Sequence, residues 1–211
     1  MDWIPRVAGL EARFAEQHGE LDERGLVRKG NAAYAAGLAS LMAGADGTPW
    51  FRRAAACWRE SWEAGAPPDA WGRPVGMLKA SLLAGDEASL EQFAHWTLEL
   101  GPATAESPIG RYAATLALLV LARWPEARHV SESLRERDDF PHDVADALAT
   151  IAAHDVVGYV EAVESVVTSF ETRDAYLEDV AVADTALALD ALARRRGIAQ
   201  PLPASPVLPS P

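Results

Sequence analysis

ASLLAGD, residues 80–86, is the clearest of four related sequence segments that decide the fold of this chain. The other copies are ASLMAG at 39–44, ATIAAHD at 149–155 and the more divergent LLVLARW at 118–124. When Ala43, Ala84, Ala122 and Ala153 are aligned, the copies lie 41, 38 and 31 residues apart. A helix that ends in small residues and turns into another helix at such a period is typical of stacked helical hairpins. Such folds usually bind macromolecules, so the sequence favours binding over catalysis.

Apolar residues recur at helical spacing through almost the whole chain, and cap-plus-proline pairs such as Ser107-Pro108 mark helix starts. We expect about ten helices, which begin near residues 3, 25, 49, 70, 87, 109, 125, 141, 156 and 182. The fold class is therefore all-α, with helices stacked as antiparallel hairpins. Two arrangements fit: a short solenoid like that of tetratricopeptide repeats, or a compact orthogonal bundle. The helix at 109–122 is apolar on nearly all faces and should be central.

The chain divides into one domain and a short tail. Residues 1–199 are expected to form a single all-α helical-hairpin domain, and residues 200–211, with five prolines, an extended tail. The N-terminus lacks a basic segment followed by an apolar run, and no apolar stretch is long enough to span a bilayer. The single cysteine, Cys57, cannot form an internal disulfide. These features predict a soluble, cytoplasmic protein.

The net charge of −12 bears on the choice of partner. Proteins that bind nucleic acid need a basic face, so we expect neither nucleic acid nor an anionic membrane as a partner. The charge is uneven, because residues 155–190 contain nine acidic residues and one basic residue, Arg173. Such a run either simply faces solvent or attracts a basic protein partner at long range.

The candidate docking surface lies at the end of the ninth helix, in the loop after it and at the start of the tenth. Its residues are Glu171, Asp174, Glu178, Asp179 and Asp184. Acidic residues near a helix C-terminus oppose the helix dipole, so they should not help to stabilise the fold there. A binding role would explain why they are concentrated in this segment.

The densest polar cluster, DDFPHDVAD at 138–146, contains types of residue that bind metals. It also lies at a predicted helix start, where the helix dipole favours acidic residues, and it lacks the Glu-x-x-His pattern of metal sites in helical bundles. We therefore expect no metal, no cofactor and no catalytic residue. Phosphate-binding loops, nucleophile elbows and Cys-x-x-Cys motifs do not occur. Cys57, in a tryptophan-rich helix, should be buried and inert.

The C-terminal stretch contains VADTALAL at 182–189, LARRRGI at 192–198 and SPVLP at 205–209. It resembles the end of the bacterial immunity protein 49 family, in which an apolar last helix also leads through a basic or aromatic turn and a Gly-Ile or Gly-Phe step to a tail ending in Leu-Pro. The resemblance implies an all-α cytoplasmic protein that neutralises a cognate toxin delivered by neighbouring cells. It assigns no individual functional residue.

Three functional hypotheses remain open. The first is a non-catalytic protein-binding module, most concretely an immunity-type inhibitor that occludes a basic toxin domain. The second is a small-molecule-binding protein or metal-dependent all-α enzyme, with its site between helices near Arg73, Arg111 and the Trp-lined core. The third is a general helical-repeat scaffold. A buried pocket with charged residues would favour the second hypothesis, and an acidic concave surface the first.

Overall fold

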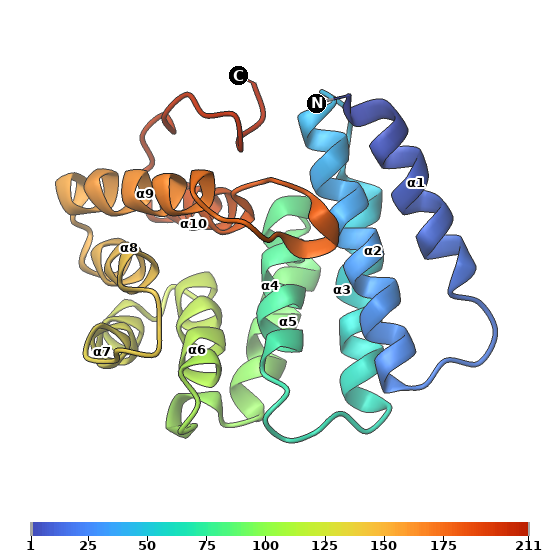
Figure 1. Cartoon of the computed structure of the whole chain (residues 1–211). Helices are drawn as coiled ribbons and strands as arrows, with labels where there is room; N and C mark the ends of the chain where they lie inside the picture. Colours follow the sequence, from blue (N-terminus) through green and yellow to red (C-terminus); the bar gives the residue numbers. More distant parts are fainter. Residues whose placement is uncertain (1, 211) are drawn as a thin grey trace.

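The fold is all-α, as predicted. The computed structural model describes residues 2–210, so Met1 and Pro211, the ends of the predicted domain and tail, lie outside the described part (Figure 1). The described residues form ten α-helices, two short 3-10 helices and no strand. The α-helices are α1 (Trp3–Glu16), α2 (Glu23–Met42), α3 (Thr48–Glu63), α4 (Gly72–Ala84), α5 (Glu87–Glu99), α6 (Pro108–Val120), α7 (Trp124–Arg135), α8 (His142–Ala153), α9 (Val156–Glu171) and α10 (Asp184–Arg196). The 3-10 helices are η1 (Pro102–Thr104) and η2 (Leu177–Asp179).

Each of the four related sequence segments contains the end of an even-numbered helix. At or just after that end, one residue has left-handed backbone angles. These residues are Gly44 (φ 72°), Gly85 (φ 63°), Ala122 (φ 54°) and His154 (φ 60°). This shared turn shows that the alignment made from the sequence was one residue off at the third copy. Ala122 corresponds to Gly44 and not to Ala43. The steps between turns are therefore 41, 37 and 32 residues. The third and fourth turns have no glycine to mark them, although glycine adopts this conformation most easily.

The helices stack in chain order from α1 to α9, and α4 also packs against α6. Figure 1 shows the helices up to α6 standing side by side, with α9 and α10 running crosswise at the upper left, above α8 and α6. α10 departs from nearest-neighbour stacking, because it packs against α4, α6, α8 and α9. The last helix thus covers the face shared by three even-numbered helices. A simple solenoid leaves such a face open, so this molecule is a closed, stacked helical bundle.

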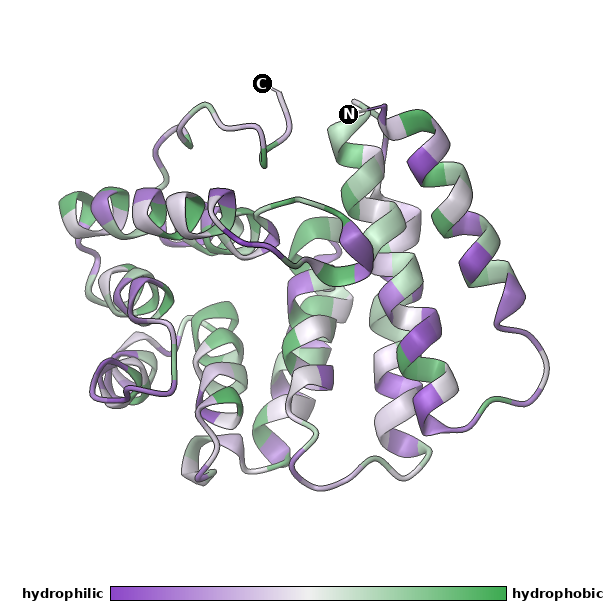
Figure 2. Ribbon diagram, in the orientation of Figure 1, coloured by the Kyte–Doolittle hydropathy of each residue, from purple (hydrophilic) through white to green (hydrophobic). Residues whose placement is uncertain are grey.

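The central position predicted for α6 is confirmed. Ten of its 13 residues are buried, and Leu116 and Leu119 are completely inaccessible to solvent. α10 contributes seven further buried residues to the same core. Figure 2 shows the apolar residues concentrated on α6 and on the helices around it. None of the described helices combines the length and apolar character needed to cross a membrane.

Some predicted boundaries shift by a few residues. Thr48 is the first residue of α3 and not its N-cap, and its backbone N–H donates to the carboxylate of Asp46 at 2.9 Å. α10 begins two residues later than predicted, at Asp184. The tail has no regular secondary structure but packs against the domain: Val207 and Leu208 are buried, and Ala183 N–H donates to the carbonyl oxygen of Val207 at 2.8 Å.

Candidate binding surfaces

The predicted docking residues lie on or beside one long connection between α9 and α10. We call residues 172–183 the strap; its 3-10 turn η2 packs against α2 (Figure 1). Glu171, Asp174 and Asp179 are exposed to solvent, whereas Glu178 and Asp184 are partly buried. The Oε1 atom of Glu171 accepts a hydrogen bond from the Ser205 hydroxyl at 2.6 Å. The five residues therefore do not form one uniform exposed surface.

Glu178 holds the strap against α1. Arg13 Nη1 lies 2.7 Å from Glu178 Oε2, and the Arg6 guanidinium donates to the Glu178 backbone carbonyl. Asp179 is 3.9 Å from Arg6 and highly exposed. Glu178 and Asp179 both have left-handed backbone angles (φ 50° and 54°), which residues other than glycine seldom adopt. The expectation that these acidic residues do not support the fold is thus wrong for Glu178.

Asp184 is also a structural residue. Its carboxylate forms an ion pair with Lys79 of α4 and accepts a hydrogen bond from the Tyr34 hydroxyl of α2 at 3.1 Å. Lys79 is only 8% exposed and also donates to Thr185 Oγ1 at 3.0 Å. Burial and the neighbouring Asp184 carboxylate raise the pKa of Tyr34 well above its ordinary value, so this hydroxyl stays neutral. The start of α10 is thereby fixed onto α2 and α4.

A cleft of about 460 Å³ lies next to this ion pair, between α2, α3 and α4. Tyr34 and Trp58 provide its aromatic lining, and Arg73 is one of its charged residues. Arg73 is therefore located where the second hypothesis expects a site, but its guanidinium is paired with Glu23. Arg111 does not line the cleft, and its Nε donates to the backbone carbonyl of Ala105 at 3.1 Å.

The charged side chains of the cleft and the Tyr34 hydroxyl are engaged in contacts with other residues of the described chain. Arg73, Lys79 and Asp184 all take part in ion pairs. No histidine or cysteine lines the cleft. Its tyrosine, Tyr34, has a raised pKa and cannot act as a base near neutral pH.

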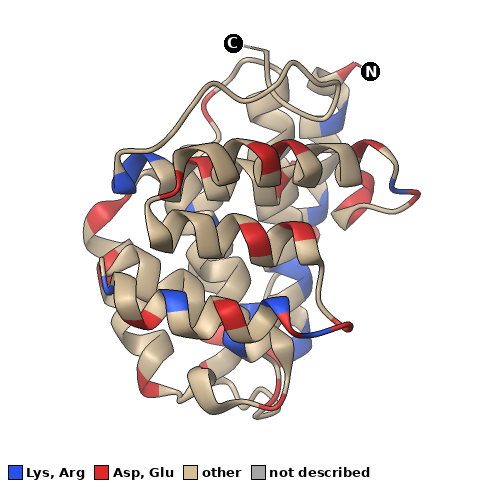
Figure 3. Cartoon of the chain, turned by 90° about the vertical axis from the view of Figure 1, so that its left-hand side faces the viewer, with Lys and Arg blue, Asp and Glu red and all other residues tan. Residues whose placement is uncertain are grey.

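A second surface is the outer side of α8 and α9, which carry acidic residues and no lysine or arginine, whereas α7 carries two acidic and two basic residues (Figure 3). Residues 1–85 contain ten acidic and ten basic residues, whereas residues 86–211 contain 21 acidic and nine basic residues. The whole net charge thus arises from the second part of the chain. On α9, Glu161 and Glu164 are exposed and form no ion pair within residues 2–210.

The sequence-based choice of docking residues missed Glu161 and Glu164, although both belong to the acidic run at 155–190. The spacing of the apolar residues in α9 could have shown that both glutamates face outward. Val163 and Val167 lie on the buried face of the helix, so helical spacing places the two glutamates on the outer face.

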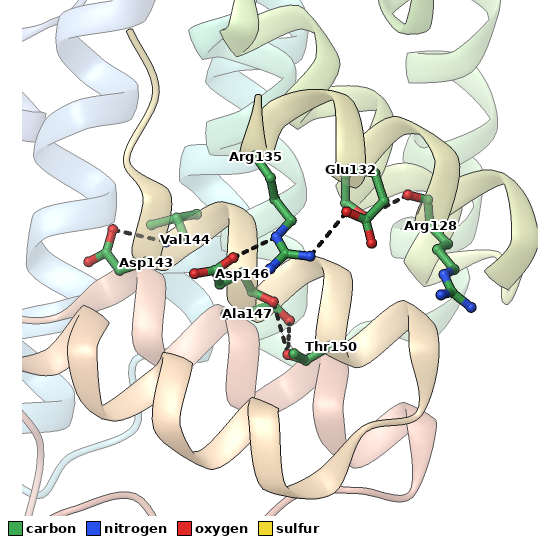
Figure 4. Close-up of polar contacts among 9 residues, drawn as sticks. Arg128, Glu132, Arg135, Asp143, Val144, Asp146, Ala147 and Thr150 are labelled. Carbon is green, nitrogen blue, oxygen red and sulfur yellow. Dashed lines mark hydrogen bonds and ion pairs between the residues drawn. The ribbon is translucent and has the colours of Figure 1, made fainter. Parts of the chain in front are cut away.

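Arg135 pairs with two acidic residues, one on α7 and one on α8. It lies between Glu132 (3.1 Å) and Asp146 (2.6 Å), as Figure 4 shows. Arg137 pairs with Asp139 at 2.6 Å. Asp143 lies in the first turn of α8, where the helix dipole favours an acidic residue, although no side chain caps this helix. Within residues 2–210, no three His, Cys, Asp or Glu side chains come together in a group that could hold a metal ion.

No family model, curated protein or solved structure matches this chain. The relationship to the immunity protein 49 family therefore stays a prediction. The residues that carry the resemblance have structural roles: Asp184 and Thr185 contact Lys79, and Val207 and Leu208 are buried. The resemblance thus concerns the closure of the bundle by α10 and the tail.

Proposed function

We propose that this chain is a non-catalytic protein-binding module, and specifically an immunity-type inhibitor that occludes a basic toxin domain. The observation that carries the proposal is the presence of exposed carboxylates on the outer face of α9 and on the strap. Glu161, Glu164 and Asp174 are exposed and have no ion-pair partner within residues 2–210. The C-terminal resemblance supplies the immunity role.

The packing of α10 supports an outer docking face. In stacked helical hairpins the concave face is the usual binding surface, but here α10 covers the face shared by α4, α6 and α8. A partner would instead meet the outer side of α9, where negative charge is concentrated. Unpaired surface charges of this kind mainly accelerate association and select partners of opposite charge.

The test uses the variant Glu161→Lys/Glu164→Lys and, as the partner, any basic toxin domain encoded by a neighbouring gene. We expect slower association with that domain in biolayer interferometry, and weaker protection of a host that expresses it. Glu11→Lys/Glu16→Lys on α1 is the matched control, because both residues are exposed and the change in net charge is the same. Equal slowing by the control, or no binding by the native chain, would contradict the proposal.

The cleft supports a second candidate function, the binding of a small organic ligand. The specific observation is that a cleft of about 460 Å³ combines Trp58 with the buried Lys79–Asp184 pair. A compound bound there should raise the melting temperature saturably. The variant Val75→Trp, which places a large side chain in the cleft lining, should abolish that increase. A compound screen that finds no ligand sensitive to this variant would eliminate the second candidate.

A further inference from the structure

One wall of the cleft between α2, α3 and α4 is aromatic and rigid. Trp58 of α3 is 6% exposed, and its Nε1 donates to Asn31 Oδ1 at 3.3 Å. A Cβ added at Gly30 of α2 would lie 2.9 Å from that Nε1, and a Cβ added at Gly76 of α4 would lie 2.9 Å from Trp58 Cε3. The indole therefore fills the space that these two glycines leave. Tyr34 packs against it, with ring centroids 5.3 Å apart.

Apolar side chains continue the lining on either side of the aromatic wall. Val27 comes from α2, Val75 from α4 and Leu177 from the strap. Leu177 is 40% exposed, which is unusual for a large apolar residue. Sites for small organic molecules have this composition, in which an apolar and aromatic lining holds the body of the ligand and a few polar groups orient it.

Two polar groups of the lining have donors to spare. Arg73 donates to Glu23 through Nη2, whereas its Nη1 is accessible to solvent and has no hydrogen-bond partner within residues 2–210. The amide nitrogen of Asn31 is also accessible and unpaired in this part of the chain, because the hydrogen bond from Trp58 occupies the amide oxygen. Both free groups are N–H donors, so a ligand that brings acceptor atoms complements them.

The charge of the cleft favours an anion. Its lining contains two cations, Arg73 and Lys79, and one carboxylate, Asp184. Lys79 and Asp184 balance each other. Arg73 is paired with Glu23, but Arg24 lies 3.3 Å from the same carboxylate, and one negative charge does not neutralise two positive ones. In addition, α4 begins with no acidic residue in its first turn, so nothing there offsets the positive end of its dipole.

We propose that the cleft binds an aromatic monocarboxylate. The carboxylate accepts hydrogen bonds from Arg73 Nη1 and the Asn31 amide, and the ring lies against Trp58 and the apolar lining. The inference rests on the second candidate function, ligand binding in the cleft, and names the class of ligand. A guanidinium group recognises a carboxylate by charge and by directed N–H donors, and such charge-assisted hydrogen bonds are stronger than neutral ones.

The test is an NMR titration of the full chain with cinnamate as the probe. We expect saturable shift changes confined to the amides of residues 27–34 and 72–79 and to the Trp58 indole N–H. Cinnamamide, a neutral molecule of nearly the same shape, should bind more weakly by on the order of tenfold, because it lacks the charge. Cinnamate shifts that do not saturate or that spread over the molecule, or equal binding of cinnamamide, would overturn the inference.

A pair of variants tests the role of Arg73. Arg73→Gln should weaken cinnamate binding by on the order of tenfold and leave cinnamamide binding unchanged. Arg24→Gln is the matched control, because it removes the other cation paired with Glu23, makes the same charge change and lies outside the lining. Unchanged cinnamate binding in Arg73→Gln, or an equal loss in Arg24→Gln, would refute the site.

If Arg73→Gln does not fold, intermolecular NOEs in the native chain decide the question. Ring protons of bound cinnamate should show NOEs to the Val75 methyl groups and to the Trp58 indole. Their absence would refute the site.

This inference and the candidate function on which it rests can fail separately. If cinnamate and cinnamamide bind equally well and Val75→Trp abolishes the binding of both, the preference for an anion is refuted and ligand binding in the cleft stands. Ligand binding itself fails when the compound screen finds no ligand that is sensitive to Val75→Trp. Docking of a toxin domain on α9 does not depend on either result.

Discussion

At the scale of single residues, the most consequential contact is the ion pair between Lys79 and Asp184. It joins α4 to the start of α10 across 105 residues of sequence, and Tyr34 adds a hydrogen bond from α2. Breaking one half of a buried pair leaves an uncompensated charge, so Lys79→Met should lower the free energy of unfolding by roughly 3 kcal/mol. Urea denaturation measures this.

The double variant Lys79→Met/Asp184→Leu is the matched comparison. It removes both charges, so it should lose less stability than the sum of the two single variants. Additive losses would show that the two side chains do not act as a pair.

Cys57 illustrates a residue whose behaviour was predicted from its surroundings. It is 7% exposed, and burial raises the pKa of its thiol to about 11. Since only the thiolate reacts, roughly 0.1% of the thiol is reactive at pH 8. We expect no labelling by DTNB in native buffer and full labelling in denaturant. Rapid native labelling would mean that the helix opens easily.

The residue scale is also where sequence reasoning falls short. Charge counting found Asp184 but assigned it to a binding surface, because nothing local to Asp184 indicates Lys79. The same holds for Glu178, whose partners Arg6 and Arg13 lie in α1. Ion pairs between distant segments depend on the tertiary fold, and an acidic run alone cannot distinguish free carboxylates from paired ones.

At the scale of helices, local sequence signals were sufficient to predict which segments are helical and which helix is central. The apolar composition of residues 109–122 predicted a central helix, and α6 is that helix. Leu119→Ala should cost about 2–5 kcal/mol of stability through lost burial and the cavity left behind. The control is Ile109→Ala in the same helix, because Ile109 is 39% exposed. Similar melting temperatures for the two variants would contradict the central role of Leu119.

The left-handed turns after the even-numbered helices support a second prediction at this scale. Ala122 adopts φ 54° and is exposed, and a left-handed alanine is disfavoured relative to glycine. Ala122→Gly should therefore stabilise the protein by about 1 kcal/mol, less the entropy that glycine adds to the unfolded chain. A lower melting temperature for this variant would indicate that Ala122 is held by contacts beyond its backbone angle.

At the scale of the whole molecule, closure by α10 is the feature that local patterns could not predict. Periodicity identified the helix, but it packs against the distant helices α4, α6 and α8, and α4 and α10 are at least 100 residues apart in sequence. The sequence favoured stacked helical hairpins and could not distinguish a short solenoid from a compact bundle. The same closure covers the face shared by α4, α6 and α8.

The tail takes part in this closure, which leads to a prediction for the whole chain. Val207 and Leu208 are buried, and the Val207 carbonyl accepts the Ala183 N–H just before α10 begins. A chain that ends at residue 199 should lose stability on the order of 3–5 kcal/mol, since each buried aliphatic side chain contributes about 1.5–3 kcal/mol. Differential scanning calorimetry measures the change.

The matched control for that truncation ends at Leu208 and keeps both buried residues. Because its missing residues include no buried side chain in the described part of the chain, it should melt close to the full chain. If both truncations melt alike, the tail is an appendage, as its proline content first suggested. If only the shorter chain is destabilised, the tail is part of the fold, because Val207 and Leu208 help to close the bundle around α10.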